Sequence, residues 1–393
     1  MAARPENAMA RKPLTDGAIA AINLESARLQ SWSRFWRAPE RSALAELILE
    51  QELLTMQFRS DFGALDRLDR LASAVARADP GAAPAAIVAA QVACAAHRFE
   101  EARAALGEAQ ARGAPSDAVE RLSLTLDQAT GESLDCVLAA RRRRAAQPGC
   151  WSELVPLGAV LADLCEFDEA ERTYQHALRD YQDVSPFALA WVCFELGMLW
   201  SERVPVPRAE VAAQWYRAAI DILPCYVKAR VHLAEILLSD GQNKDAEDLL
   251  RPALESVDPE VAWRLAEAAG NAVEATTFAA AARAGFESLL ARHPLAFADH
   301  GTEFYMAGGG EPARAFALAR LNLANRPTLR AFEQAVDAAL AAGEPLAAAE
   351  LATKARQRWA GGAAFRNSSM AIWADDFQIG TNEVPRGSAH ART

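Results

Sequence analysis

Residues 157–177 read LGAVLADLCEFDEAERTYQHA, and the spacing within this stretch decides the fold. Apolar and small residues recur at steps of about three and four, as on one face of an α-helix. The skeleton Leu157-Gly158, Leu161, Phe167, Ala170, Tyr174 and Ala177 returns as Leu196-Gly197, Trp200, Ala212, Tyr216, Ala219 and Pro224, and again as Leu233-Ala234, Leu237, Gly241, Ala246, Leu250 and Ala253. A helical pattern that recurs about every 34 residues is typical of a solenoid, in which each unit buries its apolar face against its neighbours. The repeat therefore favours an elongated all-α array over one compact enzyme core.

These positions resemble the tetratricopeptide repeat (TPR) family. The shared pattern is leucine and a small residue in the first helix, then alanine, an aromatic residue and alanine in the second, often with a closing proline. The likeness covers roughly residues 83–361 and extends vaguely to residue 40, although the consensus tryptophan of the first helix is missing from most units. The resemblance implies a right-handed superhelix of helical hairpins with the first helix of each pair on the concave side. It also implies protein or peptide binding, and no catalysis by the repeats.

The chain divides into four parts. We expect residues 1–39 to be a polar segment with a short helix, and residues 40–82 to form an atypical helical hairpin that caps the array. The array of about eight units runs over 83–361, and 362–393 is a capping segment with a disordered tail from Thr381. Within that last part, Met370 to Ile379 is expected to dock on the final helix or to serve as a recognition segment. The expected units are 83–116, 117–150, 151–186, 187–226, 227–258, 259–293, 294–328 and 329–361.

Composition excludes several classes of protein. Hydrophobic residues make up 51% of the chain but aromatic residues only 7%, because alanine, the best helix former, is abundant. With 41 Lys+Arg against 52 Asp+Glu, the net charge of −11 argues against non-specific nucleic-acid binding. The one basic run, Arg141–Arg144, is predicted to complement the negative end of a helix dipole, with a nucleic-acid patch or nuclear signal as the alternative.

The remaining signals concern the environment of the protein. Six cysteines without a CxxC pair indicate free thiols in a reducing compartment, so we expect a cytoplasmic protein. No uncharged apolar run is long enough for a membrane span. The preference for arginine over lysine, together with the alanine content, is typical of a GC-rich bacterial source.

No pattern points to a cofactor, a metal or a catalytic centre. The sequence lacks a P-loop, a dinucleotide-binding glycine motif, an HExxH zinc motif and a GxSxG nucleophile elbow. The histidines are scattered singly, and a surface or partly buried, satisfied histidine is the ordinary interpretation of such residues. We therefore predict a non-enzymatic protein without a cofactor.

If first helices line the concave groove, their inner faces supply the candidate partner-binding residues. These residues are Trp191, Phe194, Glu195, Met198, Lys228, His232, Glu235, Trp263, Arg264, Glu267, Asp299, Arg330 and Asp337. Large rings and arginine are enriched at binding hot spots, although Trp191, Phe194 and Trp263 fit packing between repeats as well.

Three functional hypotheses follow. The first is a scaffold or adaptor that binds a protein or peptide segment in the groove and supports assembly or regulation of a partner complex. The second is a non-catalytic subunit or a self-associating structural module that uses the Ala-rich end repeats and Trp359. The third is an enzyme with a site in a cleft between repeats, motivated by His232, Glu235, Glu195 and Glu267 if they face one groove.

Overall fold

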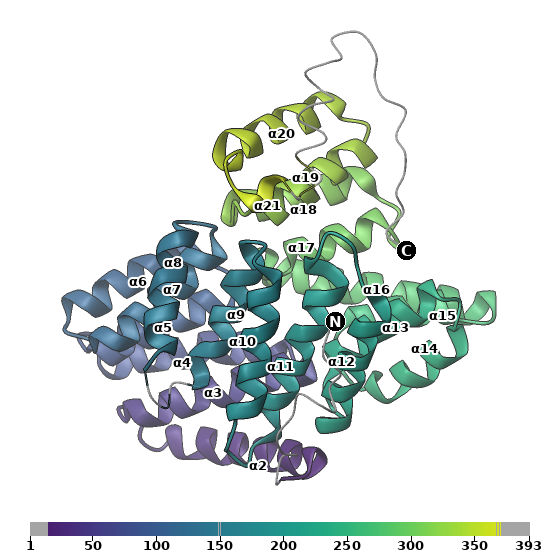
Figure 1. Ribbon diagram of the computed structural model, residues 1–393. Coiled ribbons are helices and arrows are strands. Elements are labelled where there is room, and N and C mark those ends of the chain that lie inside the picture. The colour runs from purple at the N-terminus through teal and green to yellow at the C-terminus, as the bar shows by residue number, and fades with distance from the viewer. Residues whose placement is uncertain (1–14, 148, 150, 367, 369, 371–393) are drawn as a thin grey trace.

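The structure, a computed structural model, describes residues 15–147, 149, 151–366, 368 and 370. Over these residues it holds helices and no strand, which confirms the all-α prediction (Figure 1). Among the described helices, none combines the length and the apolar composition that a bilayer-spanning segment needs. The helices are α2 (Gly17–Phe35), α3 (Ser42–Arg59), α4 (Gly63–Ala78), α5 (Ala83–Ala95), α6 (Phe99–Ala111), α7 (Ser116–Ala129), α8 (Leu134–Ala145), α9 (Leu154–Asp163), α10 (Phe167–Asp180), α11 (Pro186–Met198), α12 (Ala209–Ile222), α13 (Val227–Ser239), α14 (Asn243–Leu250), α15 (Pro259–Ala268), α16 (Ala272–Arg292), α17 (Pro294–Met306), α18 (Pro312–Asn325), α19 (Leu329–Ala341), α20 (Pro345–Trp359) and α21 (Ala363–Arg366).

Short turns join successive helices into hairpins, and several of these helices begin with a proline. Pro259 begins α15, Pro294 begins α17, and Pro345 begins α20. Proline suits the first helical turn because it lacks an amide hydrogen that the helix would leave unpaired there. The expected disorder from Thr381 concerns residues outside the described part of the chain.

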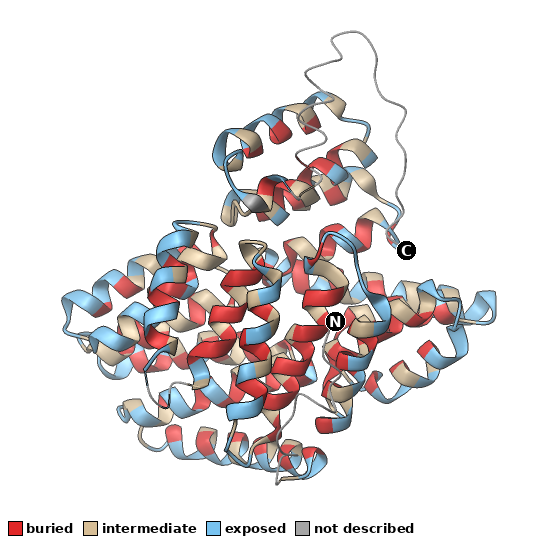
Figure 2. Ribbon diagram, in the orientation of Figure 1, coloured by how far each residue is buried: buried red, intermediate tan, exposed pale blue. Residues whose placement is uncertain are grey.

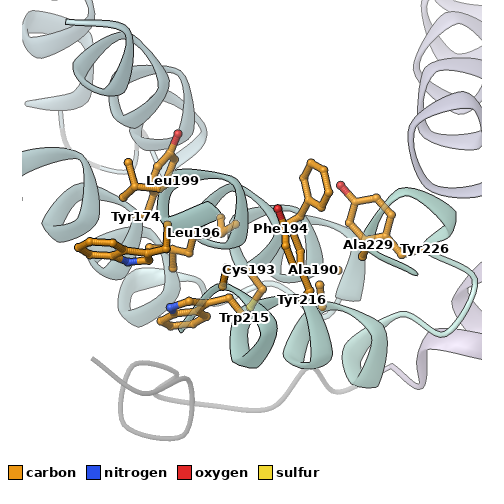
Figure 3. Packing of buried hydrophobic residues seen from close by; sticks show 14 of the residues in the cluster. Tyr174, Ala190, Cys193, Phe194, Leu196, Leu199, Trp215, Tyr216, Tyr226 and Ala229 are labelled. Atoms are coloured by element: carbon orange, nitrogen blue, oxygen red, sulfur yellow. The ribbon is translucent and has the colours of Figure 1, made fainter. Parts of the chain in front are cut away.

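A glycine in the first helix lets an aromatic ring of the second helix lie directly on the backbone. In the α9–α10 hairpin, a Cβ atom on Gly158 would lie 2.5 Å from Cε1 of Tyr174, and Gly197 is equally close to the ring of Tyr216 in the α11–α12 hairpin. Both tyrosines are buried (Figure 3). These hairpins have the form that the tetratricopeptide resemblance implies.

One hydrophobic core runs through the middle of the array. It extends from α8 to α15 and includes Trp215, Tyr216 and Tyr226, all fully buried (Figures 2 and 3). A smaller cluster joins α19 to α20, and Phe365 and Met370 pack on it. Of the Met370–Ile379 stretch, Met370 alone lies within the described residues, and it contributes to covering that last hairpin.

The ribbon of hairpins bends until later helices lie against earlier ones. Three hydrogen bonds join positions 227, 228 and 227 residues apart, so a later part of the chain lies against an earlier part at a constant offset. Six hairpins, from α5–α6 to α15–α16, separate α4 from α17, and this number of hairpins completes one turn of the solenoid. The bonds join His293 to Asp66 (2.9 Å), Asn325 to the His97 carbonyl (2.8 Å) and Arg358 to the Gly131 carbonyl (3.1 Å).

The N-terminal hairpin α3–α4, expected as a cap, also packs on the middle of the array. The ring of Phe58 in α3 lies 4.7 Å from the ring of Tyr226, which directly precedes α13. It lies 5.2 Å from the ring of Phe187, in the first turn of α11. At the other end of the α3–α4 turn, Phe62 packs edge-on against Phe297 of α17. Part of the inner wall is therefore covered by the protein's own N-terminal helices.

A buried carboxylate holds these N-terminal helices together. Glu52 of α3 is fully buried and accepts hydrogen bonds from Arg28 (3.0 Å), from Trp32 Nε1 (2.7 Å) and from Arg67 (2.7 Å). The three donors come from α2 and α4, on either side of α3. A buried charge needs such partners, because removing it from water is otherwise costly.

The basic run lies in α8, and its charges are neutralised within the fold. Arg142, Arg143 and Arg144 occupy the last turn of α8, as the dipole argument requires. Arg141 and Arg144 also pair with the buried Glu153, at 3.2 and 2.9 Å. Because these pairs occupy the guanidinium groups, the run serves helix packing, and the structure gives the nucleic-acid alternative no support.

Candidate functional site

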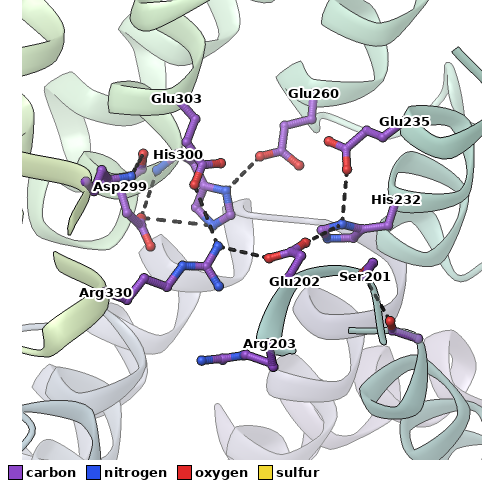
Figure 4. A network of polar contacts seen from close by, with 12 residues as sticks. Ser201, Glu202, Arg203, His232, Glu235, Glu260, Asp299, His300, Glu303 and Arg330 are labelled. Atoms are coloured by element: carbon purple, nitrogen blue, oxygen red, sulfur yellow. Dashed lines mark hydrogen bonds and ion pairs between the residues drawn. The ribbon is translucent and has the colours of Figure 1, made fainter. Parts of the chain in front are cut away.

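Polar side chains from successive first helices meet on the inner side of the solenoid (Figure 4). We call nine of them the inner polar cluster: Glu202, His232, Glu235, Glu260, Arg264, Asp299, His300, Glu303 and Arg330. They come from α13, α15, α17 and α19 and from the π-helical turn Leu199–Arg203 that follows α11. The five carboxylates of the cluster face two guanidinium groups and two imidazole groups, so charges of both signs lie next to one another.

The predicted residues His232, Glu235, Arg264 and Glu267 form one connected chain. Nδ1 of His232 lies 3.2 Å from Glu235, and Arg264 links Glu235 (2.5 Å) to Glu267 (3.0 Å). Partial burial alone would lower the pKa of His232, but Glu235 and Glu202 outweigh it and raise that pKa. The imidazole is therefore held as a cation between two carboxylates at neutral pH.

Glu202 was not among the candidate residues, yet it connects the two halves of the cluster. One carboxylate oxygen lies 3.0 Å from Nδ1 of His232, and the other accepts from Arg330 of α19 at 3.0 Å. Partial burial opposes its ionisation, but His232 and Arg330 together hold its pKa far below the usual range. A signal in the sequence is the proline-bearing stretch Ser201–Pro207, which lengthens the turn between α11 and α12 relative to the other hairpins. Its first residues complete the π-helical turn Leu199–Arg203 that carries Glu202.

The second half of the cluster surrounds His300, which also was not a candidate residue. Nδ1 of His300 lies 2.7 Å from Glu260, and the neighbouring Asp299 pairs with Arg326. Burial would lower the pKa of His300, but Asp299 and Glu260 raise it to about 10. For its one-turn neighbour Glu303, burial prevails over the nearby charges. Burial raises the pKa of Glu303 to about 7, and the guanidinium of Arg330, 3.7 Å away, offsets only part of this.

Water reaches this cluster although helices surround it. The side chains of Arg330, Glu303 and His300 are 50%, 46% and 39% exposed, while their pKa values respond to burial and to charges from several hairpins. Charged groups in such a setting are accessible to a polar ligand and only partly screened by solvent. The inner side of the solenoid is therefore a wet, charged surface.

The large rings among the predicted residues pack between repeats. Phe194 is buried against Tyr226 and Tyr216, and Trp263 is buried against Phe304 with Arg264 stacked 3.7 Å above it. The expectation that these two rings serve as hot spots for a partner needs correction, because neither offers free surface. Adjacent helices bury the apolar surface of both rings, because successive hairpins pack closely together.

The other predicted residues lie around this core. Trp191 is half-buried and donates to Glu195 at 2.9 Å. Met198 and Lys228 are half-buried, whereas Asp337 is exposed on α19. Of the three acids in the enzyme hypothesis, Glu235 contacts His232, while Glu195 bonds to Trp191 and Glu267 to Arg264. The structure therefore does not bring that quartet to one point.

An open pocket of about 520 Å³ lies elsewhere, between α3, α5 and α7. Leu49, Leu53 and Ile87 line it, with Glu46 and Glu50 at its edge. None of the residues that line it belongs to the inner polar cluster. We therefore regard the inner polar cluster as the candidate site.

Comparison with known proteins adds little. No family model matches the sequence, and no curated protein matches it. Similar solved structures include one of Naa15/Naa10 bound to HypK-THB, with 13% identity and a TM-score of 0.29 over 88% of this chain and 62% of that one. They also include the TPR domain of P58(IPK), with 11% identity and a TM-score of 0.28 over 93% and 96% of the two chains. This chain thus spans less than two thirds of the first structure. Because both TM-scores are low, the resemblance to tetratricopeptide repeats rests on the geometry of the hairpins described above.

Proposed function

We propose that this protein is a non-enzymatic scaffold that binds a polypeptide segment of a partner along the inner polar cluster. The observation that carries the proposal is the row of water-accessible charges contributed by α13, α15, α17 and α19 to one inner surface. A row that spans several hairpins suits an extended ligand better than a small molecule. Because the row presents charges of both signs, we propose that the segment carries basic and acidic side chains that pair with them.

The binding mechanism is multivalent. Each hairpin offers one or two charged groups, and the packed helices hold them in place before the partner arrives, which lowers the entropic cost of binding. Because the surface carries charges of both signs, it favours a partner segment whose charges are complementary at each position. These charges therefore contribute more to the specificity of binding than to its affinity. The buried rings Phe194 and Trp263 stabilise the frame that positions this surface.

Glu303 offers the sharpest test, because it is half-exposed and poorly paired. The substitution Glu303→Lys reverses a charge in the cluster without breaking a tight ion pair. The matched control is Glu350→Lys, the same reversal on an exposed position of α20. The assay is a pull-down from a lysate of the source organism. We expect the wild-type chain and Glu350→Lys to recover the same partner proteins, and Glu303→Lys to lose them. Equal recovery by all three proteins, with unchanged circular dichroism, would contradict the proposal.

Self-association is a second candidate function. Leu346 at the start of α20 is 81% exposed, which leaves an apolar residue on the last hairpin free to contact another copy. Trp359, the ring first considered for this role, packs edge-on against Phe332 and is half-buried. Light scattering across a concentration series, with Leu346→Glu as the comparison, separates a dimer from a monomeric scaffold.

We place this scaffold in a reducing compartment, the bacterial cytoplasm. The proposal is supported by Cys94, Cys136, Cys193 and Cys225, whose thiols form no disulfide within the described part of the chain. Its role would be to support the assembly or regulation of a partner complex.

A further inference from the structure

Three side chains of the inner polar cluster present metal-ligating atoms at one point. Nδ1 of His232 lies 3.0 Å from an oxygen of Glu202 and 3.2 Å from an oxygen of Glu235. The three donor atoms all lie within 4.8 Å of one another. In a tetrahedral zinc site with bonds of about 2.0–2.1 Å, neighbouring ligand atoms are roughly 3.3 Å apart, so two of these distances already match.

The supporting contacts fix the ligands in this arrangement. The ring of His232 stacks on Tyr216, with centroids 5.6 Å apart and planes 18° apart. The hydroxyl of Tyr216 is hydrogen-bonded at 2.8 Å to Ser201, the neighbour of Glu202. One aromatic residue therefore orients the imidazole and anchors the turn that carries the carboxylate.

The outer carboxylate oxygens are also held. Arg330 bonds to the oxygen of Glu202 that points away from His232, and Arg264 does the same for Glu235. Hydrogen bonds of this kind to ligating carboxylates are common around protein metal ions, where they fix ligand geometry. They also leave one inward-facing oxygen of each carboxylate beside Nδ1.

We propose that Glu202, His232 and Glu235 bind a divalent cation of the zinc class. One imidazole nitrogen with two carboxylate oxygens is a borderline donor set that suits zinc, whereas magnesium and calcium prefer oxygen ligands alone. The cation takes the position of the proton that His232 Nδ1 shares with the two acids. The remaining coordination position faces the wet inner surface and takes water. Such an ion would join the π-helical turn to α13.

The test uses the full chain freed of metal by a chelator and titrated with Zn²⁺ against a chromophoric chelator. We expect one Zn²⁺ per chain, and at least tenfold weaker binding for His232→Ala and for Glu235→Gln. The control is His176→Ala, which removes a histidine that pairs with Asp180 on the exposed surface of α10. Zn²⁺ should also raise Tm for the wild type and the control but not for the two ligand variants, since binding stabilises only the folded site that holds the ion.

Co²⁺ substitution gives a readout that is independent of folding defects in the variants. A wild-type spectrum with visible bands of a nitrogen- and oxygen-ligated ion, and without thiolate charge transfer, supports the site. Thiolate bands would assign the metal to a cysteine such as the exposed Cys136 and overturn the proposal. Failure to bind Zn²⁺, or full binding by Glu235→Gln, would overturn it too. None of these results depends on whether the inner surface binds a protein partner.

Discussion

The contact between Gly158 and Tyr174 gives a prediction that tests why these hairpins pack as they do. An alanine at 158 would place a methyl group 2.5 Å from Cε1, 2.7 Å from Cζ and 2.8 Å from Cδ1 of the tyrosine ring. Ordinary carbon contacts are about 3.5–4.0 Å, so the ring would have to move by about 1 Å. Tyr174 is buried, and neighbouring side chains leave it no room to do so.

Two effects of opposite sign set the magnitude. Alanine in place of glycine inside a helix stabilises by about 1 kcal/mol, and overpacking a closed core costs about 1–3 kcal/mol or somewhat more. Because three ring atoms are overlapped at once, we take the upper end of that cost. The expected net loss for Gly158→Ala is about 2 kcal/mol, or a fall in Tm of roughly 4 °C.

Gly107 provides the matched control. It lies in the exposed part of α6, and a Cβ atom there meets nothing within 4 Å. The same substitution, Gly107→Ala, should therefore stabilise by about 1 kcal/mol. Calorimetry or thermal circular dichroism of the two variants measures the predicted loss of stability at position 158 and the predicted gain at position 107.

A double variant tests the mechanism directly. The unit 227–258 carries Ala234 and Leu250 at the positions that correspond to Gly158 and Tyr174, and the smaller side chain of Leu250 leaves space for the methyl group of Ala234. In Tyr174→Leu, the further change Gly158→Ala should cost much less than in the wild type, since neighbouring residues couple in such cycles. If Gly158→Ala proved as stable as Gly107→Ala, the packing argument would be wrong.

Two further predictions concern the charged groups. Replacing Glu52 with alanine removes the fully buried partner of Arg28 and Arg67, which keep only Glu25 and Asp61 as partners. The unfolding free energy should therefore fall by about 2 kcal/mol in denaturant titrations. Glu46→Ala, on the exposed side of the same helix, should change it by less than about 0.5 kcal/mol. Because the pKa of His300 is raised to about 10, its ion pairs stabilise the fold fully below about pH 6.5 and lose this effect as pH rises toward 10. The wild type should therefore be more stable than His300→Gln by about 1 kcal/mol near neutral pH, after allowance for solvent screening, and this difference should vanish by pH 10.5. A difference that grew with pH would contradict the assignment.

The sequence by itself determined the repeating unit. Each hairpin is made by contacts between residues fewer than about 40 positions apart, such as Gly158 with Tyr174, so the pattern of small and aromatic residues predicts it directly. The same local logic predicted that His232, Glu235, Arg264 and Glu267 share a face, because equivalent positions on adjacent first helices repeat along the array. It also left open whether Phe194 and Trp263 face a partner or a neighbour.

Tertiary structure alone decided what meets across the solenoid. Small rotations between successive hairpins add up, and no single repeat records their sum. Consequently the pairing of Glu202 with Arg330, 128 residues away, and of Asp66 with His293, 227 residues away, could not be inferred from spacing. The curvature also placed Phe58 on the inner wall, against Phe187 and Tyr226. Local periodicity encodes the hairpin, whereas the accumulated curvature decides which charges face one another.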